Sequence, residues 1–197
     1  MLKKMTLLAG MALAAIAFAV PASASALEWT DNGAAFTGTA SDTLSGFIAF
    51  GEPGGTEFGC VAEVGISATG GSANGSVTSF TPNTAECAGT GPFSGCELES
   101  DSTTGLPAAV SIVETSKLTM SNASIVIHNV YKPGCLIEKV TLTVSHLTFN
   151  LNGRSDLTDV TVEGLALAHI TAGGVESTET VGVFGTVGTA TDTLSVS

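Results

Sequence analysis

The sequence has few aromatic and few basic residues. Aromatic residues make up 6% of the 197 positions, with one tryptophan and one tyrosine, while lysine and arginine together number 6. A sugar-binding cleft would need more aromatic side chains than this. The formal net charge is −12, and a surface of that sign repels nucleic acid and anionic lipid. The composition therefore argues against sugar, nucleic acid and anionic membranes as partners.

The chain also lacks the motifs of several common catalytic sites. No serine stands in a G-x-S-x-G pattern, and neither G-x-x-x-x-G-K nor G-x-G-x-x-G after a strand occurs. No C-x-x-C pair is present, which argues against a zinc ribbon and a thioredoxin-like redox site. We therefore predict a protein that is not an enzyme and needs no cofactor. A secreted hydrolase is the alternative.

A nearly uninterrupted apolar run at residues 5–20 follows two lysines close to the start of the chain. Small residues come next and offer a cleavage site after Ala24 or Ala26. This pattern predicts a helical secretory signal peptide over residues 1–26. A membrane span needs about 20 apolar residues, so a retained anchor is the less favoured alternative. We expect a bacterial protein that is secreted, periplasmic or on the cell surface.

Residues 27–197 are predicted to form a single domain. After cleavage, four fixed positive charges remain against 18 acidic residues, which gives a formal charge of −14. Such a charge favours solubility and leaves cations or cationic polymers as partners. We expect no transmembrane segment after cleavage, and either self-association or a surface or matrix partner.

All four cysteines lie between residues 60 and 135, at Cys60, Cys87, Cys96 and Cys135. In an exported chain, four cysteines predict two disulfides. Three pairings are possible. We favour the pairing of the first with the second and of the third with the fourth, because a hairpin turning at residues 70–72 returns the chain towards Cys60.

After the signal peptide, apolar and polar residues alternate in short segments that glycine and proline separate. This pattern predicts an all-β domain, arranged as an antiparallel sandwich or a jelly roll. A β-solenoid is the alternative, but it would show a fixed repeat along the chain. We find no such repeat.

Several segments carry more specific expectations. The alternation of apolar residues changes phase between Val144 and Leu147, which predicts a β-bulge or a bend. Residues 97–106 are expected to form an acidic loop. The apolar segment 124–131, SIVIHNVY, is expected to be a buried central strand, and as an exposed edge it would support self-association.

One segment occurs twice. Residues 38–45 and residues 188–195 are identical at seven of eight positions. We interpret the two copies as equivalent strands at the two ends of the chain. Two copies of a surface or assembly element are the alternative.

Two groups of residues have the chemistry of metal ligands. The three histidines lie in different predicted strands, and a structural role is favoured for each: His128, His146 and His169. The best calcium candidates are four oxygen-bearing side chains around a predicted Asn-Gly turn: Asn150, Asn152, Asp156 and Asp159. They follow no known calcium-binding repeat, so a solvated loop is the favoured reading.

The layout resembles one family. An early Phe-Thr-Gly-Thr segment at 36–39 and Gly-Leu-Pro at 105–107 accompany the signal peptide and the four spread cysteines. In these features, over about residues 34–145, the chain is similar to the small exported alkane-oxidation activators, the PraB-like family. The resemblance implies a secreted or surface-associated, non-catalytic protein that is linked to growth on, or adhesion to, hydrophobic substrates.

The predicted function is surface contact, in adhesion, in a matrix or in the cell envelope. The alternatives are a module that binds a small apolar ligand or a cation, and a hydrolase. The three differ in what the structure must contain. A contact protein needs an exposed apolar patch or an open strand edge, a ligand module needs an apolar pocket with a few polar groups, and an enzyme needs a cleft with a nucleophile.

Overall fold

The structure, a computed structural model, describes residues 27–121, 123–190 and 194–197. Over this part of the chain it contains thirteen strands and one short 3-10 turn. The predicted signal peptide lies outside the described residues. In chain order the elements are β1 (Trp29–Asp31), β2 (Ala34–Ala35), β3 (Thr39–Gly51), β4 (Glu57–Thr69), β5 (Asn74–Gly89), η1 (Gly91–Phe93), β6 (Leu98–Thr104), β7 (Ala108–Glu114), β8 (Lys117–Met120), β9 (Ile125–Tyr131), β10 (Ile137–Asn150), β11 (Val160–Ala172), β12 (Val175–Gly188) and β13 (Leu194–Val196).

Two pairs of short strands act as two long ones. β6 is followed directly by β7, and β8 by β9, with a break in each pair. β7 pairs antiparallel with β8, and β6 pairs antiparallel with β9. On the same edge of β10, β8 pairs with residues 147–150 and β9 with residues 139–144. The chain therefore runs up and down through eight long strands, each next to the one that precedes it.

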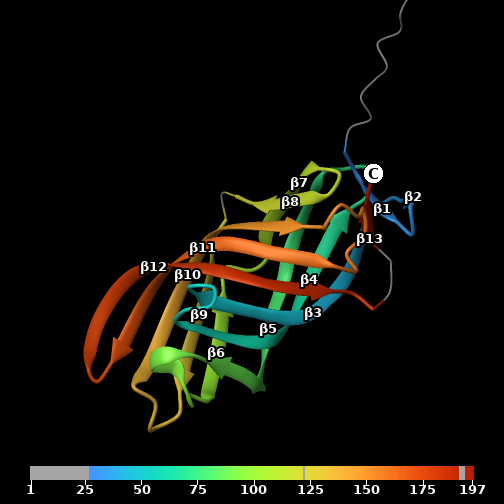
Figure 1. The fold of residues 1–197 in the computed structure, drawn as a ribbon. Coiled ribbons are helices and arrows are strands. Elements are labelled where there is room, and N and C mark those ends of the chain that lie inside the picture. The colour runs from blue at the N-terminus through green and yellow to red at the C-terminus, as the bar shows by residue number, and fades with distance from the viewer. Residues whose placement is uncertain (1–26, 122, 191–193) are drawn as a thin grey trace, which may run out of the picture.

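The ladder closes on itself. β10 pairs with β11 and β11 with β12, and β12 then pairs with β3 over residues 182–188. The result is an eight-stranded antiparallel barrel, whose long strands are seen in Figure 1. The all-β prediction is confirmed. The sandwich or jelly roll is not confirmed. The last long strand pairs with the first one, so the long strands form one closed ladder and not two packed sheets.

The barrel has one interruption in its backbone pairing, which we call the seam. β5 is hydrogen-bonded to β7 only over residues 74–77. The rest of β5, residues 78–89, lies beside β6, and no hydrogen-bonded ladder joins the two strands. Pro82 lies in this stretch and has no N–H to donate, a property that suits proline to unpaired strand edges.

One end of the barrel is covered by a small sheet of β1, β2 and β13, near the C-terminus in Figure 1. Trp29 is fully buried there, and its backbone N–H donates a hydrogen bond to the carbonyl of Ser72, 3.1 Å away, in the β4–β5 turn. On the other side of the sheet, the N–H of Val196 donates to the carbonyl of Ser155, at 2.6 Å. These bonds attach both ends of the described chain to the barrel.

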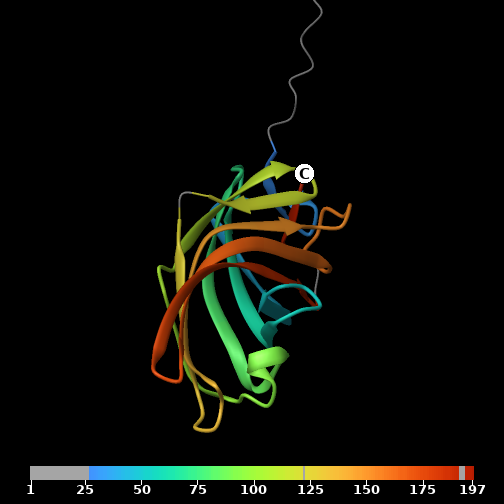
Figure 2. The same cartoon turned by 60° about the vertical axis from the view of Figure 1, so that its left-hand side comes forward.

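The opposite end is filled by aromatic side chains. The rings of Phe50, Phe58, Phe93 and Tyr131 lie with centroids between 4.9 and 6.0 Å apart. Phe93 comes from η1, which Figure 2 shows at the end of the molecule away from the C-terminus. We call these four residues the aromatic plug. Two of these contacts, Phe50 with Phe93 and Phe58 with Tyr131, are edge-to-face, and such contacts add about 0.5–1.5 kcal/mol each to the burial of the rings.

The two disulfides join Cys60 to Cys87 and Cys96 to Cys135, so the predicted pairing is confirmed. The first crosses from β4 to β5, and the second joins the segment before β6 to the segment after β9. Each constrains the unfolded chain by about 3–4 kcal/mol in the loop-entropy model. Two disulfides with no free cysteine among the described residues indicate an oxidising compartment.

The local expectations had mixed outcomes. The predicted bulge is present, because the β10–β11 register shifts between Val144 and His146. The predicted loop at 97–106 is wrong, because residues 98–104 form β6, whose ladder with β9 accommodates polar side chains on exposed positions. SIVIHNVY is a central strand, with β6 on one side and β10 on the other.

The interpretation of the repeat as two equivalent strands is wrong. Residues 39–45 of the first copy belong to the barrel strand β3. The second copy starts at the end of β12 and ends in β13 of the small sheet, and residues 191–193 lie outside the described residues. Similar residues adopt different roles here because their neighbours differ. The two copies meet where Gly188 pairs with Ser45, and where the Thr189 hydroxyl donates a hydrogen bond to Asp42 Oδ1, 3.2 Å away.

Tyr131 provides a test of the aromatic plug, because it is the only tyrosine. Burial raises the pKa of its phenol above the usual 10.0, and the nearby Asn129 side chain, which lowers it, offsets only part of the rise. In an ultraviolet titration, we expect no tyrosinate near pH 10 while the protein is folded. Because the folded pKa is the higher one, stability falls as the pH rises above about 10. The same titration in denaturant is the control, and a normal tyrosine pKa in the folded protein would contradict the plug.

Candidate functional site

The interior of the barrel contains a cavity of about 70 Å³ next to the aromatic plug. A cavity needs about 10–15 Å³ to hold one water, and an engineered cavity of about 150 Å³ accepts benzene. The space therefore suits a short alkyl group or a molecule of similar size. Its walls come from seven strands: β3, β4, β5, β9, β10, β11 and β12.

The cavity wall is apolar because of strand register. Partners across an antiparallel ladder point to the same side of the sheet. Phe50 pairs with Phe58, and Ile48 pairs with Cys60, so all four face inwards together. Beyond them, Val183 pairs with Phe50 from β12. The remaining wall residues are aliphatic with few exceptions, and no lysine, arginine, aspartate, glutamate or histidine is among them.

Asn129 is the one hydrophilic side chain in the wall. It is 6% exposed and stands in β9 between Ile127 and Tyr131 on the inward side. A carboxamide both donates and accepts hydrogen bonds. Burying such a group among hydrocarbon costs free energy unless it finds a partner. Asn129 therefore gives the cavity one fixed position where a polar atom is bound in preference to a carbon atom.

The cavity opens towards the seam. Three of its wall residues face inwards but remain partly exposed: Ile48, Phe80 and Ile127. Phe80 comes from the stretch of β5 that has no ladder to β6, and Ile127 comes from β9, the other neighbour of β6. Solvent therefore reaches inward-facing side chains on β5, at the seam, and on β9, one strand beyond β6. An entering molecule would pass between β5 and β6 without breaking a backbone ladder.

β6 adds two polar side chains to this opening. Asp101 pairs with Asn129, and Thr103 pairs with Ile127, so both share the inward side of the sheet. The hydroxyl oxygen of Thr103 is buried and has no hydrogen-bond partner. Burial raises the pKa of Asp101, and a backbone hydrogen bond opposes the rise. We call Asp101, Thr103 and Asn129 the seam polar group.

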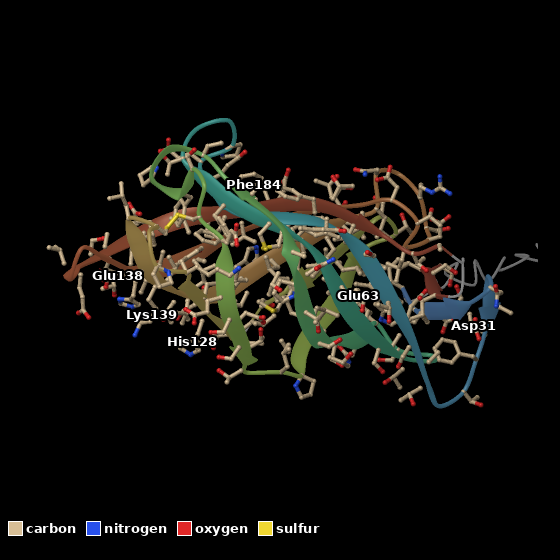
Figure 3. All side chains as sticks on the ribbon, turned by 90° about the horizontal axis from the view of Figure 1, so that it is seen from below. Asp31, Glu63, His128, Glu138, Lys139 and Phe184 are labelled. Carbon is tan, nitrogen blue, oxygen red and sulfur yellow. A yellow bond between two sulfur atoms is a disulfide. The ribbon has the colours of Figure 1, made fainter. Side chains whose placement is uncertain are left out.

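The histidines lie on the outer face. His128 Nδ1 is 3.0 Å from the hydroxyl of Thr141, and His169 Nδ1 is 2.8 Å from the hydroxyl of Thr178. Figure 3 shows His128 and Lys139 on the same side of the molecule. A polar hollow of about 510 Å³ lies over β10, β11 and β12 there. Within the described residues, no three His, Cys, Asp or Glu side chains gather as metal ligands.

The four calcium candidates lie in or beside the β10–β11 connection, where hydrogen bonds engage side-chain oxygens of three of them. Asn150 Oδ1 accepts from the N–H of Asn152 at 3.0 Å, and Asn152 Oδ1 accepts from the hydroxyl of Thr161 at 3.1 Å. Asp156 is bound by Arg154 through two bonds, at 2.9 and 3.2 Å. Asp159 takes part through its backbone carbonyl, which accepts a hydrogen bond from the Asn152 side chain at 3.5 Å. The calcium site stays a prediction.

Four apolar side chains form a second surface feature, the outer apolar strip: Phe47, Leu165, Leu167 and Phe184. They occupy the outer side of β3, β11 and β12, which are neighbours in the barrel. Leu165 is 58% exposed and Leu167 is 43% exposed. Contiguous exposed apolar side chains of this kind commonly mark contact surfaces.

The chain matches no family model, no curated protein and no solved structure. Among the described residues, no helix has the length and apolar character needed to cross a membrane.

Sequence reasoning missed the cavity, although one signal was available. The strict alternation in SIVIHNVY places Ile125, Ile127 and Asn129 on one side of the strand. An asparagine on the apolar side of a central strand marks a polar position inside the core. That six further strands leave space around it depends on long-range packing, which no local pattern encodes.

Acid titration tests the β10–β11 connection. The Arg154 guanidinium, together with hydrogen bonds from Thr158, lowers the pKa of Asp156 from 3.8 to about 2. A carboxyl whose pKa is lower in the folded state stabilises the protein above its unfolded pKa, and this contribution is lost as the pH falls towards 2. We expect Asp156→Asn to reduce the loss of thermal stability between pH 4 and pH 2. Asp159→Asn, in the same turn but outside the ion pair, is the control, and equal acid profiles for wild type and Asp156→Asn would contradict the prediction.

Proposed function

We propose that this protein is an exported, non-catalytic module that binds a small apolar molecule inside its barrel. The observation that carries the proposal is the apolar cavity with one buried polar side chain, Asn129, and an opening at the seam. Ligand sites are typically concave, mostly apolar and equipped with a few placed polar groups. Closed eight-stranded barrels hold single small ligands in the same way.

Export supports this reading. The predicted signal peptide over residues 1–26 and the two disulfides agree with an oxidising, extracytoplasmic location. A protein in that location can bind a compound from the environment before the compound enters the cytoplasm. The resemblance to the alkane-oxidation activator family, itself a proposal, points towards hydrophobic compounds as well.

The driving force is hydrophobic burial. Each buried methylene contributes about 0.8 kcal/mol, which corresponds to about a fourfold gain in affinity. Because no ionisable side chain lines the cavity wall, the buried part of the ligand is expected to be uncharged. A cavity of about 70 Å³ limits the buried part to a short chain.

A series of linear alcohols from 1-butanol to 1-octanol tests the proposal. We expect the dissociation constant, measured by calorimetry or by titration of backbone amide signals, to fall about fourfold per added methylene. The gain should end once the cavity is full. The amide signals that shift should be those of β9, β5 and β3.

Two variants locate the binding site. Val162→Phe fills the cavity from β11, and Ile127→Phe narrows its opening from a partly exposed position. Both should weaken binding at least tenfold. Leu165→Ala, which removes an exposed apolar side chain outside the cavity, is the matched control and should bind normally. Full binding by both phenylalanine variants, or loss of binding by Leu165→Ala, would contradict an interior site.

Surface contact is the second candidate function, and the outer apolar strip favours it. The strip would bring the protein to hydrophobic surfaces in adhesion, in a matrix or in the cell envelope. Its four side chains lie on three adjacent strands, so they present one continuous apolar area.

Partition onto hexadecane droplets tests this candidate. We expect Leu165→Ser with Leu167→Ser to reduce adsorption several-fold, since two large apolar side chains leave the contact. Val113→Ser with Val175→Ser is the control, because these valines are 45% and 69% exposed but lie outside the strip. Equal adsorption by the two double variants would show that the strip has no special role.

A further inference from the structure

We propose that the seam polar group selects the head group of the ligand: it accepts a primary ammonium or a hydroxyl and rejects a carboxylate. This inference rests on the proposed interior binding site. It concerns a different property, since the cavity determines how much hydrocarbon is bound, while Asp101, Thr103 and Asn129 determine which polar end accompanies it.

The register places the three side chains together. Asn129 lines the cavity, and Asp101 is its direct partner across the β6–β9 ladder. Thr103 is the next inward residue along β6, opposite Ile127 at the opening. Inward neighbours two residues apart on a strand are separated by about 7 Å. A short alkyl chain in the cavity therefore has its polar end among these three groups.

The hydrogen-bonding capacity of the group favours donors. A carboxylate only accepts hydrogen bonds, and a hydroxyl and a carboxamide each accept as well as donate. The Thr103 oxygen is buried without a partner, so it lacks a hydrogen bond that a ligand can supply. An ammonium with three N–H donors matches three acceptors, and an alcohol matches one or two of them.

The charge of the group excludes anions. Among the described residues the ion pairs join Lys132 to Glu97 and Arg154 to Asp156, and neither includes Asp101. Lys139 belongs to the polar hollow on the outer face. A carboxylate head would meet the Asp101 carboxylate without a compensating cation. An ammonium head would supply the missing positive charge, and partial burial of Asp101 strengthens that attraction.

Three ligands with the same tail test the inference at neutral pH: hexylamine, 1-hexanol and hexanoate. We expect wild-type protein to bind hexylamine most tightly and hexanoate at least tenfold more weakly than hexylamine. Asp101→Asn should reduce the ratio of hexylamine to hexanoate affinity by about tenfold. Its affinity for 1-hexanol should stay within about twofold, because the amide still accepts a hydrogen bond.

Two further variants separate local from general effects. Glu99→Gln removes the same charge from an exposed position of the same strand and should leave the ratio unchanged. Thr103→Val removes a buried hydroxyl that has no partner, so the fold should be retained while hexylamine affinity falls several-fold.

The outcomes separate the two proposals. If none of the three ligands binds, the interior site itself is wrong. If 1-hexanol binds but hexanoate binds as tightly as hexylamine, the interior site stands and head-group selection is wrong. An equal change in the ratio for Asp101→Asn and Glu99→Gln would also overturn the selection, because it would assign the effect to net charge.

Discussion

The backbone pairing of β12 with β3 is the interaction on which the rest of the structure depends. It closes the ladder, so that a row of long strands has no exposed first and last edge. The two strands approach closely because glycine occurs at their contact. A Cβ at Gly46 would lie 2.1 Å from the carbonyl oxygen of Thr186, and one at Gly185 would lie 2.1 Å from that of Phe47. Closure separates an interior from an outer face, and the inward side chains of all eight strands then pack together in the limited volume of that interior.

The seam is the exception to this closure, because backbone pairing is missing there on one side of the barrel. Two pairings along the barrel from the closing pair, β5 and β6 lie side by side without a ladder. The disulfides compensate for the missing pairing, because they join β5 to β4 and anchor the segment before β6. An interior that is covered at one end by the small sheet and filled at the other by the aromatic plug thus opens at its side. Most polar residues of β6 are tolerated as strand residues because they lie on exposed positions, while Asp101 and Thr103 are half-buried on the inward side.

Much of the architecture could be read from the sequence. Alternation predicted strands, the hairpin geometry predicted the disulfide pairing, and a phase change predicted the bulge between Val144 and His146. These features are local or nearly so. The errors concern long-range partners. Residues 98–104 form a strand because β9 supplies the ladder, and residues 188–195 divide between two sheets because β3 and β1 take up different parts.

By itself, the sequence determined the strand character of the domain and its negative charge, and it favoured one of three disulfide pairings, because these follow from residue types and their spacing. Only the tertiary structure decided that the strands close into a barrel, that a small cavity remains beside Asn129, and that Asp101 and Thr103 stand next to Asn129 and Ile127 on the inward side. The physical reason is that strand alternation specifies two sides but does not say which side becomes the interior. That choice is made when β12 pairs with β3, at residues more than 130 positions apart in the chain.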